Sequence, residues 1–252
     1  MHSTTRTVFL AMIASALCLA ACTKEEPEQP APDPGGSGTT PTNTSTTPTF
    51  NGSSGTLWAI NTYSSQVVGG FPFEMESGMG VALFPSAADA AVLVDAGTVK
   101  LNDLDLTRQS NNTYISLPSQ TNPMGIDLSS GTTHWTVSGA NGVPAVDQTP
   151  SFTFPDVGEI TSSTTVDRGS GYTLSANNVS ACDSVVFMVG GVVKYKPSGT
   201  SSCTFTSAEL AGLAAGPSLI QVSAYSYAHQ VIGGKDFYFG KQTARTLGAT
   251  VQ

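Results

Sequence analysis

Charged side chains are scarce in this sequence. Asp, Glu, Lys and Arg make up 11% of its 252 residues, against about 25% in an average protein. Ten basic residues face eighteen acidic ones, which gives a net charge of −8. Proteins that bind nucleic acid neutralise phosphates with clustered Lys and Arg. We therefore expect no nucleic-acid partner.

Histidine is nearly absent, with three residues in the whole chain. Only His134 and His229 lie beyond the first residues, which is too few for a histidine-rich metal site. The sequence also contains no GxSxG, SxxK or HExxH motif, the usual marks of nucleophilic and zinc hydrolases. We therefore predict no cofactor, no metal and no enzyme, and we interpret both histidines as solvated surface residues.

A long apolar run is missing too. Residues 8–21 are apolar except for Ser15, which is too short for the roughly 20 residues that cross a bilayer. A short basic start, an apolar run and small residues are typical of a secretory signal. The run ends in Leu19-Ala20-Ala21-Cys22, which resembles the lipobox of bacterial lipoproteins. The resemblance implies a signal peptide over 1–21 and a lipid on Cys22. Such a lipid would anchor the protein stably, because two or more acyl chains hold a protein at a membrane.

The residues after Cys22 predict an exposed position outside the cell. Lys24-Glu25-Glu26 is similar to the export signal of Gram-negative surface lipoproteins, which implies the outer face of the outer membrane. A solvated linker start is the other interpretation, and the sequence leaves the surface and the periplasm both open. Residues 22–54 are rich in Pro, Thr, Gly and Ser and show no apolar periodicity, so we expect a disordered linker.

From residue 55 onward the pattern predicts an all-β protein. Short alternating segments are separated by Gly, Asn, Asp, Ser and Pro, as in sandwiches and barrels. Prolines near 150–156 suggest two consecutive β-sandwich domains, over 55–155 and 156–252. The segment 206–213 followed by a Gly-Pro-led strand resembles the sheet crossing of immunoglobulin-like domains. The whole chain resembles uncharacterised surface lipoproteins, a class that implies no common reaction.

Several turns and core residues follow from local signals. Alternation puts Trp58 and Trp135 in the core. Asn102-Asp103 predicts a tight hairpin turn, and the pairs Gly69-Gly70, Gly190-Gly191 and Gly233-Gly234 predict three more. Thr206 and Glu209 have the spacing of a capping box, which predicts one helical turn.

The cysteines predict one disulfide. Cys18 lies in the predicted signal peptide and Cys22 in the lipobox, which leaves Cys182 and Cys203. An even pair in an exported protein is normally oxidised. Two buried thiols are the alternative.

Tyrosines on one strand are the candidate ligand contacts. In the predicted strand over 219–225, alternate residues form an apolar face, and Tyr225 and Tyr227 extend the other, mostly polar face. Tyrosines on such a face form a binding platform. Cross-strand pairing that only stabilises the sheet is the alternative.

These observations predict a surface-anchored, non-enzymatic binding or interaction module for a glycan or a partner protein. One alternative is a hydrolase of extracellular polymers, which would need paired carboxylates such as Glu74 with Glu76 or Asp103 with Asp105. The other alternative is a structural spacer of the cell envelope. Exposure of Tyr225 and Tyr227 is the feature that discriminates among the three.

Overall fold

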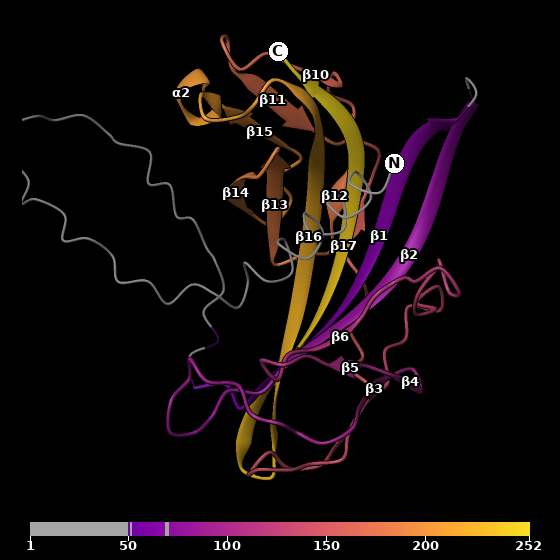
Figure 1. Cartoon of the computed structure of the whole chain (residues 1–252), viewed down its shortest axis with the longest axis vertical. Helices are drawn as coiled ribbons and strands as arrows, with labels where there is room; N and C mark the ends of the chain where they lie inside the picture. The colour runs from indigo at the N-terminus through magenta and orange to yellow at the C-terminus, as the bar shows by residue number, and fades with distance from the viewer. Residues whose placement is uncertain (1–49, 51, 69–70) are drawn as a thin grey trace, which may run out of the picture.

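The computed structural model describes residues 50, 52–68 and 71–252 of the chain. The signal peptide, Cys22, Lys24-Glu25-Glu26, Gly69-Gly70 and nearly all of the predicted linker lie outside these residues. Strands make up nearly all of the regular secondary structure of the described part (Figure 1), which confirms the all-β prediction. Within it, no helix is both long and apolar enough to cross a membrane.

One long sheet runs through the molecule. Its order is β14-β13-β16-β17-β1-β2-β6-β5, and β10 pairs with the end of β17. The strands are β14 Val192–Pro197, β13 Ser184–Val189, β16 Gly216–Ile232, β17 Lys235–Val251, β1 Gly55–Val68, β2 Phe71–Leu83, β6 Tyr114–Ser116, β5 Thr107–Arg108 and β10 Thr165–Val166.

Smaller sheets cover this long sheet at its two ends. Near the bottom of Figure 1 lies a four-stranded sheet of order β4-β3-β7-β8, and two strand pairs, β11 with β15 and β9 with β12, lie higher up. Their bounds are β4 Leu104–Asp105, β3 Val99–Leu101, β7 Trp135–Val137, β8 Val146–Gln148, β11 Tyr172–Ser175, β15 Ser202–Phe205, β9 Asp156–Val157 and β12 Val179–Ser180.

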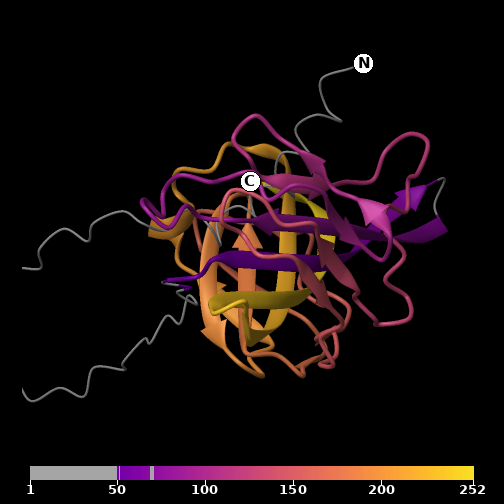
Figure 2. The ribbon, with the colours of Figure 1, turned by 90° about the horizontal axis from the view of Figure 1, so that it is seen from below.

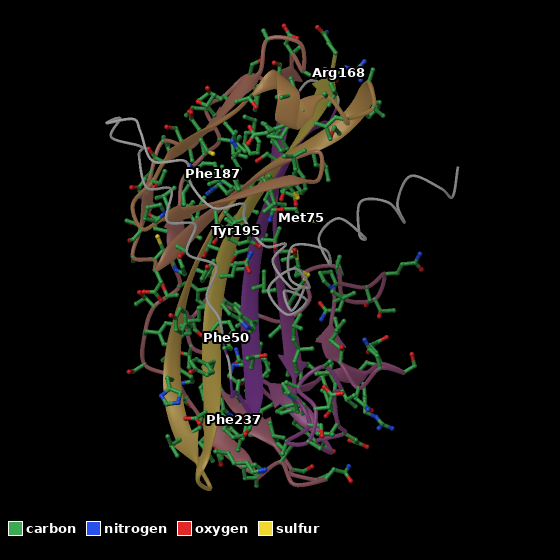
Figure 3. The ribbon with its side chains drawn as sticks, turned by 90° about the vertical axis from the view of Figure 1, so that its left-hand side faces the viewer. Phe50, Met75, Arg168, Phe187, Tyr195 and Phe237 are labelled. Atoms are coloured by element: carbon green, nitrogen blue, oxygen red, sulfur yellow. The ribbon has the colours of Figure 1, made fainter. Side chains whose placement is uncertain are left out.

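Each end of the long sheet encloses its own hydrophobic core. The lower core centres on Leu57, Phe84, Trp135, Phe237 and Phe239, and the upper core on Leu174, Phe187, Phe205, Ile220 and Val222. Figure 3 shows Phe187 and Phe237 far apart along the long axis, with Phe50 between them. The β16–β17 hairpin contributes to both cores. The division into domains over 55–155 and 156–252 stays a prediction.

The hairpin of β16 and β17 is much longer than the alternation predicted. Each strand has 17 residues, where the sequence suggested strands over 219–225 and 235–239 with a further piece over 246–251. Polar residues interrupt the apolar alternation in the middle, but backbone pairing continues through them because β1 flanks β17 in parallel. The far end of the β1–β2 hairpin projects from the body when the molecule is seen from below (Figure 2).

The predicted turns are confirmed where the structure describes them. Asn102 and Asp103 have φ of 48° and 65° between β3 and β4, as a tight hairpin turn requires. Gly190-Gly191 joins β13 to β14, and Gly233-Gly234 joins β16 to β17. The helix α2, Ser207–Leu210, begins with the predicted capping box of Thr206 and Glu209.

The predicted disulfide is wrong. Cys182 and Cys203 are both free cysteines. Cys203 is buried on β15, opposite Leu174 of β11, whereas the Cys182 Sγ lies 3.8 Å from the Ser198 Oγ beside the β13–β14 hairpin. Cys182 therefore lies in the connection between β12 and β13 and Cys203 on β15, although both contact the upper core. Burial raises the pKa of the Cys203 thiol.

Between the two cores, one face of the long sheet is polar, and Lys241 lies there. Lys241 is 2% exposed, and its Nζ donates hydrogen bonds to the carbonyls of Gly131 and Phe152 at 2.8 and 2.6 Å. The ammonium also lies 5.0 and 5.3 Å from the ring centroids of Phe152 and Phe154. Desolvation lowers the pKa of Lys241. This lysine ties two loops of the lower body to the sheet.

Candidate functional site: an aromatic patch on the long hairpin

The prediction of an exposed platform is confirmed for Tyr227 and wrong for Tyr225. Tyr227 is 38% exposed, as the sequence suggested, but Tyr225 is fully buried. The Tyr225 ring packs edge-on against Trp58, with centroids 5.7 Å apart. Burial raises the pKa of Tyr225 to about 12. Tyr225 is therefore a core residue and not a ligand contact.

Packing across a glycine explains why Tyr225 is buried. On one side of the sheet, Trp58 of β1 lies opposite Gly240 of β17, and Gly240 in turn lies opposite Tyr227 of β16. A Cβ at Gly240 would lie 2.2 Å from the indole of Trp58. The indole therefore crosses the bare backbone of β17 and reaches Tyr225. Together with Ile60, Met79 and Val81, these two rings form a third cluster.

Beyond Tyr225 the same face becomes an exposed aromatic patch. We define the aromatic patch as Phe50, Tyr227, His229 and Tyr238. Phe50 lies 5.3 Å from Tyr227 and 4.8 Å from Tyr238, ring centroid to ring centroid, and the His229 ring lies 4.9 Å from Tyr238. Tyr227 and His229 are exposed, and Phe50 and Tyr238 are half-buried. Four rings thus share one surface near the point where the described chain begins.

A polar pair lies at the lower end of the patch. The His229 Nε2 is 2.6 Å from the Asp236 Oδ1, and both side chains are about half exposed, at 44% and 50%. Val231, two pairs further toward the turn and opposite Asp236, is 64% exposed. The patch therefore combines apolar ring surface with hydrogen-bonding groups.

Sequence reasoning missed three of the four rings. His229 was expected in a loop but lies on β16, because that strand runs up to the Gly233-Gly234 turn. Two antiparallel strands joined at this correctly predicted turn place His229 opposite Tyr238. The turn was therefore the sequence signal from which this pair could have been found. Phe50 gave no signal, since it follows a polar linker and meets the patch only in the folded chain.

The other sequence candidates lie apart from the patch. His134 contacts Asp147 at 2.8 Å and Asp105 contacts Lys100 at 3.0 Å, both on the four-stranded sheet. Glu74 and Glu76 lie within strand β2 and not in a turn. Within the described residues, no group of three or more His, Cys, Asp or Glu side chains is placed to hold a metal ion.

Comparison with known proteins gives little. No protein-family model and no curated protein matches the chain. Among solved structures, a chain of a bacterial ice-binding adhesin, studied for its retention at the host cell surface, matches at 20% identity with a TM-score of 0.23. The match covers 69% of this chain and 57% of the adhesin chain. Such a likeness carries no conclusion about fold or function.

Proposed function

We propose that this protein is a non-enzymatic binding module, held by a lipid on Cys22 at the outer face of the outer membrane, that binds neutral glycans through the aromatic patch. The single observation behind this proposal is the group of four adjacent rings with a His–Asp pair beside them. The anchor rests on the lipobox-like sequence and the position on Lys24-Glu25-Glu26.

The composition of the patch suits a sugar ligand. A sugar ring has an apolar face of C–H groups, which packs on aromatic rings, and a rim of hydroxyls, which need donors and acceptors. The phenol groups of Tyr227 and Tyr238 and the His229–Asp236 pair supply both kinds of polar group. The formal charges beside the patch are acidic: Asp236 pairs with His229, and the Asp183 Oδ2 accepts a hydrogen bond from the Tyr227 backbone N–H at 3.0 Å. We therefore favour an uncharged polymer over an anionic one.

The patch is a surface on a strand pair, and none of its four residues lines the polar cleft beside Asn61 and Arg245. Small ligands are usually enclosed on most sides. An open row of rings is better suited to an extended chain that passes across it.

Binding to a panel of neutral polysaccharides by the purified full chain tests the proposal. In affinity electrophoresis we expect retention by at least one polymer. The double variant Tyr227→Ala/Tyr238→Ala should weaken binding about tenfold or more, since buried contacts of interfacial tyrosines commonly contribute above 1 kcal/mol each. Phe73→Ala is the matched control, because Phe73 is a 57% exposed aromatic on β2 outside the patch.

Four results would contradict the proposal. If the double variant is retained as strongly as the wild type, the ligand binds elsewhere on the protein. Release of reducing sugar ends would make the protein a hydrolase. Protection of the folded part from protease added to intact cells would place it in the periplasm, and a Cys22→Ala variant that still fractionates with membranes would remove the lipid anchor.

A partner protein is the second candidate, and Val231 favours it. An aliphatic side chain that is 64% exposed, on the same strand as Tyr227 and His229, resembles the anchor of a protein interface. Capture of a surface protein that depends on both Tyr227 and Val231, without retention by any glycan, would decide for this candidate.

A further inference from the structure

A polar cleft opens on the face of the long sheet opposite to the aromatic patch. Its volume is about 210 Å³. The floor consists of Asn61 and Tyr63 from β1, Glu76 from β2 and Arg245 from β17, and the segment around Asp156 forms a wall. The cleft lies where the lower and upper cores meet, so both ends of the molecule contribute to it.

A buried amide in this cleft lacks a partner for its oxygen. Asn61 is 7% exposed. Its Nδ2 donates to the Glu76 Oε1 at 2.8 Å and to the Tyr63 hydroxyl at 3.1 Å, and that hydroxyl donates to the same Glu76 oxygen at 3.3 Å. These bonds fix the amide, but its Oδ1 has no hydrogen-bond partner among the described residues. A buried acceptor without a donor destabilises a protein by about 1–3 kcal/mol, and a ligand donor that reached this oxygen would remove that cost.

The cationic groups beside the cleft already have partners. The Arg245 Nε donates to the Val157 carbonyl at 2.6 Å, its Nη1 contacts Glu74 at 2.5 Å, and the guanidinium lies 4.7 Å from the Tyr63 ring centroid. Lys241 is held by two backbone carbonyls. Among the described residues, Glu76 and Asp156 form no ion pair with a Lys or Arg side chain, although the Asp156 Oδ2 accepts a hydrogen bond from the Asn178 Nδ2. The cleft is therefore rich in acceptors.

We propose that this cleft binds the primary ammonium group of a small organic ligand. An ammonium carries three donors and a positive charge, which match the Asn61 Oδ1 and the carboxylates of Glu76 and Asp156. The volume equals that of about seven water molecules at roughly 30 Å³ each, so it admits a single amino-bearing unit and not a folded partner. An amino sugar and a lysine side chain share this chemistry. The inference does not rest on the glycan proposal, because the two sites lie on opposite faces.

Calorimetric titration of the purified full chain tests the inference. The probes are glucosamine and Nα-acetyl-lysine methyl ester, and the neutral counterparts are glucose and the Nε-acetylated lysine ester. We expect at least one amine to bind and both neutral counterparts to fail. Which amine binds distinguishes a sugar source from a peptide source.

Two variants locate the binding. Glu76→Gln keeps an oxygen for Asn61 and Tyr63 but removes the charge, and we expect affinity for the amine to fall about tenfold or more, since a hydrogen bond to a charged group contributes about 1.5–3 kcal/mol. Asp156→Asn should weaken binding too. Because Asp156 is exposed, this variant should fold and can test the inference even if Glu76→Gln does not fold. Asp105→Asn is the matched control, because it makes the same change of net charge on the four-stranded sheet.

Four outcomes would overturn the inference. Failure of both amines to bind removes the ligand class, and equal binding of glucosamine and glucose shows that the ammonium is not recognised. Unchanged affinity in a folded Glu76→Gln or Asp156→Asn protein places the ligand elsewhere. Tight binding of calcium chloride that displaces the amine would instead assign the cleft to a metal ion.

Discussion

The two faces of the long sheet are built from alternate residues of the same strands, yet their middle sections differ in chemistry. On the cleft face, β17 places Lys241, Thr243 and Arg245 between the two cores. On the aromatic face, Gly240 and Gln242 let Trp58 and Tyr225 meet across the strand. One face of the strand pair therefore carries both cores with a polar section between them, whereas the other face carries a separate cluster of packed rings.

The largest expected effect compares two tyrosines of the aromatic face. Tyr225→Ala removes a fully buried ring from the third cluster, and we expect the free energy of unfolding to fall by about 3–5 kcal/mol. Tyr227→Ala removes a ring that is 38% exposed and should lower it by about 1 kcal/mol or less. Equilibrium urea unfolding measures both. Equal losses would show that the buried and exposed parts of this face are not distinct.

On the cleft face, Lys241 is the residue whose loss should matter most. Lys241→Ala leaves the carbonyls of Gly131 and Phe152 without a donor, and we expect a loss of about 2–4 kcal/mol in the same assay. Lys241→Met keeps most of the volume and should lose less. A larger loss in the methionine variant than in the alanine variant would contradict this account.

The contribution of Lys241 to the free energy of unfolding should also depend on pH. Burial lowers the folded-state pKa of Lys241 below its ordinary value of 10.5, so just below pH 10.5 the unfolded state binds more protons than the folded state. The free energy of unfolding therefore gains from this group as the pH rises toward 10.5. Subtracting the pH profile of Lys241→Met from that of the wild type should isolate this rise, and a flat difference would refute it.

An intermediate effect is expected at the glycine beneath Trp58. Gly240→Ala places a Cβ 2.2 Å from the indole, and overpacking of this kind destabilises by about 1–3 kcal/mol. Near-ultraviolet circular dichroism should also report a displaced tryptophan. Gly248→Ala, on the same strand with no atom within 4 Å of the new Cβ, serves as the control and should be close to neutral.

The smallest effect concerns the rim of the cleft. The Glu74–Arg245 ion pair is 2.5 Å long, but the Glu74 side chain is 44% exposed, so solvent screens it. Glu74→Gln should lower the free energy of unfolding by less than about 0.5 kcal/mol. A loss above 1 kcal/mol would mean that the upper and lower cores depend on this surface pair and not on Lys241.

Local signals predicted the parts of the fold that depend on a few neighbouring residues. The Asn102-Asp103 turn, the two described Gly-Gly turns and the capping box at Thr206 each use backbone preferences of the residues themselves. The core positions of Trp58 and Trp135 followed from alternation. The pairing of Cys182 with Cys203 failed because composition suggests oxidation but only the fold places two sulfur atoms.

The amino-acid sequence by itself determined the all-β class, the turns and the alternation that separates the two faces of each strand. Only the tertiary structure decided that β1 lies parallel to β17, which brings Trp58 over Gly240 and buries Tyr225. It also decided that Phe50 joins Tyr227 and Tyr238, and that Asn61 and Glu76 meet Arg245 at one cleft. The physical reason is that residues far apart in the chain become neighbours only through strand pairing, whose register is set by the whole sheet.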